Sequence, residues 1–247
     1  MIPNHTKLHI LAIGVHPDDV ELSCAGTLLV ELQRGNPCGI LDLTQGELGT
    51  RGTVITRKAE ATHAAAVLGI TIRENLSMQD GFVANDKAHQ LSIIQVLRKY
   101  QPNIVLCNAP EDRHPDHGRT ATLVADACFL SGLRKIETHH NGTPQQAWRP
   151  KQVLHYIQDR YLQPNFVIDI SAVHHTKMEA IRCYTTQFNS ADDTEPQTYI
   201  SQPNFLAGVV NRAAMYGKMI GVDYAEGFIT KKMVGLRTLN DLISEDT

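Results

Sequence analysis

Short apolar runs alternate with longer segments of helical spacing along the first half of this chain. Leu8 to Gly14, Gly39 to Leu43 and Asn103 to Asn108 each read as a buried strand. The segments between them predict helices over Asp19 to Arg34, Thr56 to Leu68 and Ala88 to Tyr100. Strands that alternate with helices are typical of a parallel sheet covered by helices on both faces. The pattern therefore predicts an α/β fold of three layers with a mostly parallel sheet.

The second half continues this alternation. It predicts helices over Arg119 to Leu130, Ser171 to Tyr184 (with Ser171 as the N-cap) and Phe205 to Met219, and strands over Val153 to Ile157 and Phe166 to Ile170. A chain of 247 residues, 42% of them hydrophobic, can bury one large core. Because the sequence contains no internal repeat and no low-complexity tract, we expect a single domain over residues 1–247.

Charge and composition argue against several classes of partner. The formal net charge of −3 provides no basic field for nucleic acid. No apolar run approaches the roughly 18 residues of a membrane span, and Met1 to His9 lacks the features of a secretion signal. We therefore expect a cytoplasmic protein without a membrane partner. The five cysteines are widely spaced and form no C-x-x-C pair, so we expect buried free thiols.

Three polar loops directly follow predicted strands: Val15 to Asp19, Thr44 to Thr53 and Ala109 to His117. In open α/β sheets, ligands bind beyond the carboxyl ends of the strands, where the strand order reverses. A Rossmann-like arrangement would therefore bring these loops together. We expect the functional site at the C-terminal ends of the strands.

Two of these loops carry clustered histidines and carboxylates. The first contains His16-Pro17-Asp18-Asp19, where a carboxylate could equally well cap the following helix. The second contains His114-Pro115-Asp116-His117. Catalytic zinc usually takes three nitrogen and oxygen ligands and keeps one position open for water. Two ligands from the first loop and one from the second would satisfy that requirement.

The motifs H-P-D-D, T-x-G-E-x-G-T-R-G and H-P-D-H-G follow one another in this order along the chain. This series resembles the zinc-dependent N-deacetylases that include the enzyme acting on N-acetylglucosaminyl phosphatidylinositol. Within that family it is most similar to the bacterial deacetylases of bacillithiol biosynthesis, and the similarity continues through Pro164 to Asp169, Gln187-Phe188 and Gly221 to Phe228.

The resemblance implies a role for each residue of the two loops. His16, Asp19 and His117 would be the zinc ligands, although such a ligand set also accepts iron, cobalt or manganese. Asp18 would be the general base. His114, protonated through a carboxylate partner such as Asp116, would stabilise the developing oxyanion. Tyr199 is the candidate for an assisting tyrosine, with Tyr184 as the second choice.

Four further residues are candidate substrate contacts. Glu47 and Arg51 lie in the glycine-rich loop, which suits sugar hydroxyls but could also be an ordinary solvated loop. The resemblance implies that Arg57 and Arg113 face the substrate, and an arginine fork suits a carboxylate such as that of malate. A structural ion pair is an equally good interpretation of Arg57.

The function implied by the resemblance is hydrolysis of an N-acetylglucosaminide to the free amine and acetate, with N-acetylglucosaminyl malate as the substrate. Another N-acetylated sugar, such as a chitooligosaccharide or an antibiotic precursor, is the alternative. A non-enzymatic α/β binding module is a third hypothesis, although the first β-α turn lacks a glycine-rich phosphate-binding motif. The family also implies a homo-oligomer.

Overall fold

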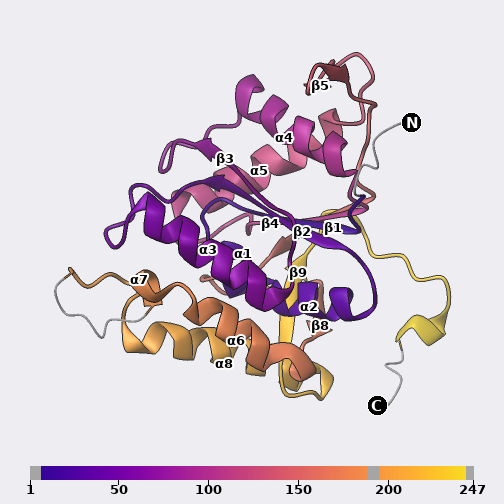
Figure 1. Ribbon diagram of the computed structural model, residues 1–247. Helices are drawn as coiled ribbons and strands as arrows, with labels where there is room; N and C mark the ends of the chain where they lie inside the picture. The colour runs from indigo at the N-terminus through magenta and orange to yellow at the C-terminus, as the bar shows by residue number, and fades with distance from the viewer. Residues whose placement is uncertain (1–6, 189–194, 243–247) are drawn as a thin grey trace.

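The computed structural model describes residues 7–188 and 195–242, and its centre is a seven-stranded sheet (Figure 1). The strand order across the sheet is β3-β2-β1-β4-β7-β9-β8. The strands are β1 (Ile10–Gly14), β2 (Cys38–Thr44), β3 (Arg73–Met78), β4 (Ile104–Cys107), β7 (Gln152–Tyr156), β8 (Phe166–Asp169) and β9 (Ala225–Ile229). A separate two-stranded ribbon joins β5 (His139–His140) to β6 (Thr143–Pro144).

The strands β3, β2, β1, β4 and β7 pair in parallel, whereas β9 pairs antiparallel with both β7 and β8. The chain runs outward from β1 to β2 and β3, then returns to place β4 on the other side of β1. The strand order therefore reverses between β1 and β4, and the loops after these two strands open beside each other. The expected mostly parallel sheet is confirmed.

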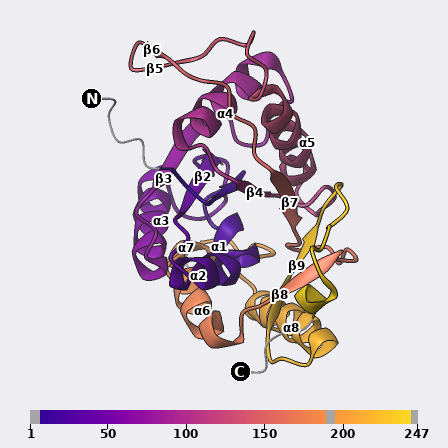
Figure 2. The same ribbon diagram turned by 90° about the vertical axis from the view of Figure 1, so that its right-hand side faces the viewer.

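Helices cover both faces of the sheet, which makes the three expected layers (Figures 1 and 2). The α-helices are α1 (Asp19–Ser23), α2 (Ala25–Gln33), α3 (Val54–Leu68), α4 (Lys87–Tyr100), α5 (Pro115–Leu130), α6 (His174–Arg182), α7 (Thr185–Phe188) and α8 (Pro203–Ile220), with short 3-10 turns at η1 (Ser171–Val173) and η2 (Leu239–Leu242). Along β1, Ile10 and Ala12 belong to one apolar core and Leu11 and Ile13 to the other. Successive side chains of a strand point to opposite faces, so a strand buried on both faces reads as one continuous apolar run.

Several predicted element boundaries were wrong. The helix predicted from Asp19 to Arg34 is interrupted at Cys24, where φ is −141° and the helix restarts as α2. Ser171 lies inside η1 and does not cap α6. The backbone N–H of Ser171 instead donates a hydrogen bond to the Asp169 carboxylate. Helix α5 begins at Pro115 instead of Arg119, so His117 lies in its first turn.

The cysteines and the hydropathy of the helices can be read from the described part of the chain. All five cysteines are free, four of them buried and Cys183 half-buried. Among residues 7–188 and 195–242, no helix combines the length and the hydropathy needed to cross a bilayer.

Candidate active site

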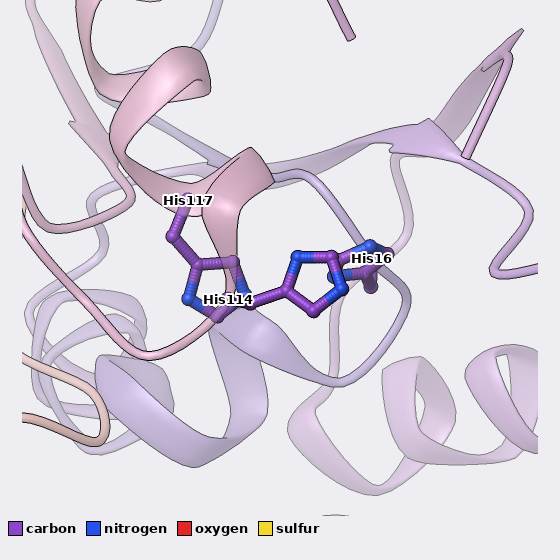
Figure 3. A group of neighbouring side chains, drawn as sticks. All are labelled: His16, His114 and His117. Atoms are coloured by element: carbon purple, nitrogen blue, oxygen red, sulfur yellow. The ribbon is translucent and has the colours of Figure 1, made fainter. Parts of the chain in front are cut away.

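The loops after β1, β2 and β4 converge on one cavity of about 290 Å³ at the carboxyl edge of the sheet. His16 follows β1, while His114 and His117 follow β4 at the start of α5, and the three imidazole rings lie together (Figure 3). The ring centroids of His16 and His114 are 4.6 Å apart, and those of His114 and His117 are 5.3 Å apart. The two predicted segments therefore form one site.

A carboxylate lies on each side of the His16 ring. Its Nε2 lies 2.9 Å from Oδ1 of Asp80, a residue of the loop after β3. Its Nδ1 faces the other way and lies 3.8 Å from Oδ2 of Asp19. A carboxylate at Nε2 favours the tautomer with the proton on that nitrogen, which leaves the lone pair of Nδ1 free.

His117 is buried between two carboxylates. Its Nδ1 lies 2.6 Å from Oδ2 of Asp112, and its Nε2 lies 3.4 Å from Oδ1 of Asp19. Burial lowers the pKa of this imidazole, but Asp19 and Asp112 outweigh burial and raise the pKa to about 10. A position that holds a proton this strongly also attracts a metal cation, and a carboxylate behind Nδ1 is a common partner of a metal-bound histidine.

Asp19 lies at the centre of the constellation and is almost fully buried. Its Oδ2 accepts hydrogen bonds from the Asn108 amide and from the His16 backbone N–H, and its Oδ1 accepts one from Gln158. Burial raises its pKa, yet the neighbouring His117 and His16 outweigh burial and hold the pKa well below the usual range. Asp19 is therefore an anion with fixed orientation.

These residues fit a divalent metal ion. The donor set of two imidazoles and one carboxylate is typical of catalytic zinc, and each donor is oriented by a further polar group: Asp80 behind His16, Asp112 behind His117, and Asn108 and Gln158 on Asp19. Within the part of the chain that the structure describes, two groups have possible ligand atoms within 4.8 Å of one another: His16, His114 and His117, and His16, Asp80 and Asp116. The set of His16, Asp19 and His117 is the better fit. Nδ1 of His114 accepts a hydrogen bond from the Asp116 backbone N–H, and the carboxylates of Asp80 and Asp116 accept the backbone N–H groups of Leu48 and Gly81.

Asp18 is buried beside this set and has an unusual backbone conformation. Its φ of 126° lies in the region that favours glycine, and its side chain makes no cap hydrogen bond to α1. The interpretation of Asp18 as a helix cap is therefore wrong. Burial raises the pKa of its carboxyl to about 7, although the Arg57 guanidinium at 3.4 Å opposes this shift. Backbone strain of this kind is concentrated at functional sites.

His114 is the N-cap of α5, and its Nδ1 accepts the Asp116 backbone N–H at 3.3 Å. An accepting Nδ1 carries no proton, so the proton of the neutral ring is on Nε2. Burial, His16 and His117 together lower the pKa of His114. The carboxylate of Asp116 instead accepts hydrogen bonds from the Gly81 N–H and from Arg119. The Asp116 carboxylate is thus directed to Gly81 and Arg119, and His114 offers its Nε2–H to the cavity.

Comparison with known proteins identifies the family. Residues 11–128 match the family described as PIG-L: GlcNAc-PI de-N-acetylase. An uncharacterized deacetylase of Escherichia coli, YaiS, is 34% identical over 66% of this chain and 88% of its own length. The chain belongs to the PIG-L family. It is thus a deacetylase, as the sequence motifs predicted.

Further similarities span nearly the whole chain. The diacetylchitobiose deacetylase of Thermococcus kodakarensis is 29% identical to this deacetylase over 88% of the present chain and 81% of its own. The crystal structure of the conserved protein TT1542 from Thermus thermophilus superposes with a TM-score of 0.83 at 32% identity, covering 93% of this chain and 98% of that one.

The two candidate tyrosines of this PIG-L deacetylase have different surroundings. Tyr199 lines the cavity and is half-exposed, and its hydroxyl donates to Oδ1 of Asp159 at 3.1 Å. Tyr184 is fully buried outside the cavity, where its hydroxyl donates to Glu21 and accepts from Arg73. Tyr184 is therefore a structural residue, and only Tyr199 can reach a substrate.

Of the four residues predicted to contact the substrate, two line the cavity and two do not. Arg57 and Arg113 line the cavity, whereas Glu47 and Arg51 do not. Glu47 accepts the Asp80 backbone N–H at 2.8 Å. Arg51 turns inward, where its Nε donates to the Thr186 carbonyl at 3.0 Å. Both side chains therefore lie outside the cavity lining and fix the glycine-rich loop against other segments.

Sequence reasoning missed the residues that orient the metal-ligand set. Asp112 lies two residues before the H-P-D-H-G motif, and Asn108 and Gln158 follow β4 and β7 without any distinctive pattern. Asp80 lies beyond β3. The polar sequence of that segment does not predict a strand. The single available signal was the Asp80-Gly81 pair, which is typical of a turn.

Asp80 connects the glycine-rich loop to a metal-ligand candidate, because its Oδ2 accepts the Leu48 N–H while its Oδ1 contacts His16. We expect Asp80→Ala to weaken metal affinity by about 10- to 100-fold, the usual effect of losing a carboxylate behind a metal-bound histidine. Asp80→Asn retains one acceptor and should lose less. Competition with a chromophoric chelator measures both, and exposed Asp126→Ala is the control. Equal affinity in all three variants would remove Asp80 from this role.

Proposed function

We propose that this deacetylase hydrolyses the N-acetyl group of an N-acetylglucosaminide with a divalent cation, zinc as the first candidate, held by His16, Asp19 and His117. The observation that carries the proposal is the buried carboxylate of Asp18, which lines the same cavity as this oriented donor set. Once bound, such a cation would supply Lewis acidity, which lowers the pKa of a water molecule and polarises the acetamide carbonyl.

The chain's own groups supply the proton transfers. Asp18 accepts a proton as water adds to the carbonyl carbon and delivers it to the leaving amine, as a general base and then a general acid. Burial brings its pKa near neutrality, and a neighbouring cation would favour its ionised form. The Nε2–H of His114 donates a hydrogen bond to the carbonyl oxygen as that oxygen becomes negative. The hydroxyl of Tyr199, which donates to Asp159 in this structure, becomes a second candidate donor if it turns from Asp159 to the substrate.

The size and lining of the cavity suit one sugar ring. Its volume of about 290 Å³ is near the lower limit of small-molecule sites. The backbone of Gly46, Gly49 and Gly81 forms part of its wall and offers close approach to hydroxyl groups. A sugar bound here would extend its anomeric substituent, the aglycone, toward the mouth.

Two substrate classes have specific support. N-acetylglucosaminyl malate is favoured by the motif resemblance, and a Bacillus anthracis protein named as a probable deacetylase of that compound is 30% identical over 48% of this chain. A chitooligosaccharide is favoured by the Thermococcus relative, which is named for diacetylchitobiose. The two classes share the acetamide chemistry and differ in the aglycone.

The test combines metal content with acetate release. We expect the purified protein to bind about one zinc equivalent and to release acetate from at least one of the two substrates. His117→Ala should lose bound metal and fall to background turnover, because it removes a ligand and the partner of both Asp19 and Asp112. His175→Ala, an exposed histidine on α6, is the matched control. Full activity in the His117 variant would refute the proposal.

A further inference from the structure

Charged side chains around the cavity are strongly unbalanced in favour of acid. Five carboxylates line the cavity but only two guanidinium groups, Arg57 and Arg113. The carboxylates are those of Asp18, Asp19, Asp80, Asp112 and Asp159. No lysine contributes to the lining within the described ranges. Whether a negatively charged substrate can bind therefore depends on how free these two arginines are.

Arg113 is already occupied at the mouth of the cavity. Its Nε lies 3.1 Å from Oδ2 of Asp159, and its guanidinium carbon lies 4.4 Å from the ring centre of Tyr199. The Tyr199 hydroxyl donates to the other oxygen of Asp159 at 3.1 Å. These three side chains, here called the rim triad, close on one another. A ligand carboxylate would therefore have to compete with Asp159 for Arg113.

Arg57 lies deeper in the cavity, beside the carboxylate assigned as the general base, and its Nε and Nη1 make no hydrogen bond to the residues that the structure describes. It is buried, and its Nη1 lies 3.4 Å from Oδ2 of Asp18. A Cβ added to Gly46 would lie 3.1 Å from its Nη2, so backbone closely covers that side of the guanidinium. Withdrawing Arg57 to bind a substrate carboxylate would leave Asp18 buried without its cation, a costly exchange.

Three arginines outside the cavity lining also have polar partners within the protein. Arg51 binds the Thr186 carbonyl, Arg119 lies 3.1 Å from Asp116, and Arg160 lies 3.3 Å from Glu111. Arg212 of α8 lines a separate small void beside Glu226. At the mouth of the cavity, an anionic aglycone would thus meet the Asp159 carboxylate and an Arg113 that is already paired with it, whereas Arg57 is buried deeper beside Asp18.

Uncharged surface is available at the same place. Tyr199 is 50% exposed and its ring meets that of Phe205 edge to face, and Ile200 and the 62% exposed Leu48 also line the cavity. Aromatic and aliphatic faces of this kind pack against the C–H face of a sugar ring, and the rim carboxylate can accept hydrogen bonds from sugar hydroxyls.

We infer that the rim triad makes this deacetylase select N-acetylglucosaminides with an uncharged, hydroxyl-bearing aglycone over those with a carboxylate aglycone. The inference rests on the proposed function and chooses between its two substrate classes. It makes Asp159 a specificity-determining residue, because Asp159 both neutralises Arg113 and repels an anion. A neutral saccharide is accordingly the preferred aglycone.

The test compares N-acetylglucosaminyl malate with the same glycoside in which both carboxylates are primary amides. We expect kcat/KM to be about 10-fold or more higher for the diamide, mainly through KM, since like charges at a binding site oppose association. Asp159→Asn frees Arg113 and should shift the ratio of the two kcat/KM values about 10-fold toward malate. Glu111→Gln frees the more exposed Arg160 and is the matched control, with the ratio unchanged.

The outcomes separate this inference from the proposed function. Preference of the unmodified protein for the malate glycoside would overturn the inference and leave the deacetylase function intact. A ratio that Asp159→Asn does not move would also overturn it, because the rim triad would then have no part in selectivity. If neither glycoside nor diacetylchitobiose released acetate, the proposed function itself would fail.

Discussion

Replacing Asp18 with asparagine is expected to lower kcat by about 10²- to 10⁴-fold, the usual contribution of a positioned general base. The amide cannot accept the proton of the attacking water. Metal content should stay at the level of the unmodified protein, because the carboxylates assigned to the metal-ligand set and its supports are Asp19, Asp80 and Asp112. Asparagine is also the best replacement for the backbone, since it tolerates positive φ better than alanine does.

The measurement pairs initial rates of acetate release with metal analysis of the same preparation. Asp126→Asn, the same substitution at an exposed site on α5, is the control and should change neither quantity. His16→Ala is the contrasting variant, which should lose metal and turnover together. If Asp18→Asn lost as much metal as His16→Ala, Asp18 would be a ligand and the assignment of the base would be wrong.

The sequence was sufficient to predict that His16 and His117 meet. Both follow apolar runs that could only be central strands, and adjacent parallel strands end at the same edge of a sheet. Their loops therefore converge whatever the details of the connecting helices. The distances of 3.8 Å from His16 and 3.4 Å from His117 to the Asp19 oxygens agree with this argument.

The orienting residues could not be predicted, because long-range packing alone brings them to the site. Strand β3 lies at the edge of the sheet and consists of Arg73-Glu74-Asn75-Leu76-Ser77-Met78, with no apolar run to reveal it. Asp80 was therefore missed along with the strand. The direction of Arg51 depends on Thr186, 135 positions further along the chain. Local pattern carries no information about such contacts.

Arg73 shows how an edge-strand residue with no apparent pattern can determine stability. Its guanidinium lies 2.7 Å and 2.9 Å from the two oxygens of Asp42, and its Nη1 lies 2.6 Å from Glu21. Both carboxylates are nearly inaccessible to water, and Oε2 of Glu21 has no hydrogen-bond partner. One cation thus balances two buried anions underneath the active site.

We expect Arg73→Met to reduce the free energy of unfolding by about 3–5 kcal/mol, the usual consequence of removing one partner from a buried ion pair. Methionine keeps much of the apolar volume, so the loss reports the uncompensated carboxylates. Urea denaturation of the metal-free protein measures it, so that metal binding does not add to the stability. Arg134→Met, at an exposed position, should change the value by no more than about 0.5 kcal/mol.

The pH dependence of this loss distinguishes charge from packing. Burial already raises the pKa of Asp42, although Arg73 opposes that shift. Without Arg73 the pKa should rise further, so the folded variant binds protons more tightly than the unfolded chain does. Its stability deficit should therefore be smallest near pH 5 and grow as the pH rises toward 8, since folding then has to bury ionised carboxylates. A deficit that is constant over this range would assign the effect to lost packing instead of unbalanced charge.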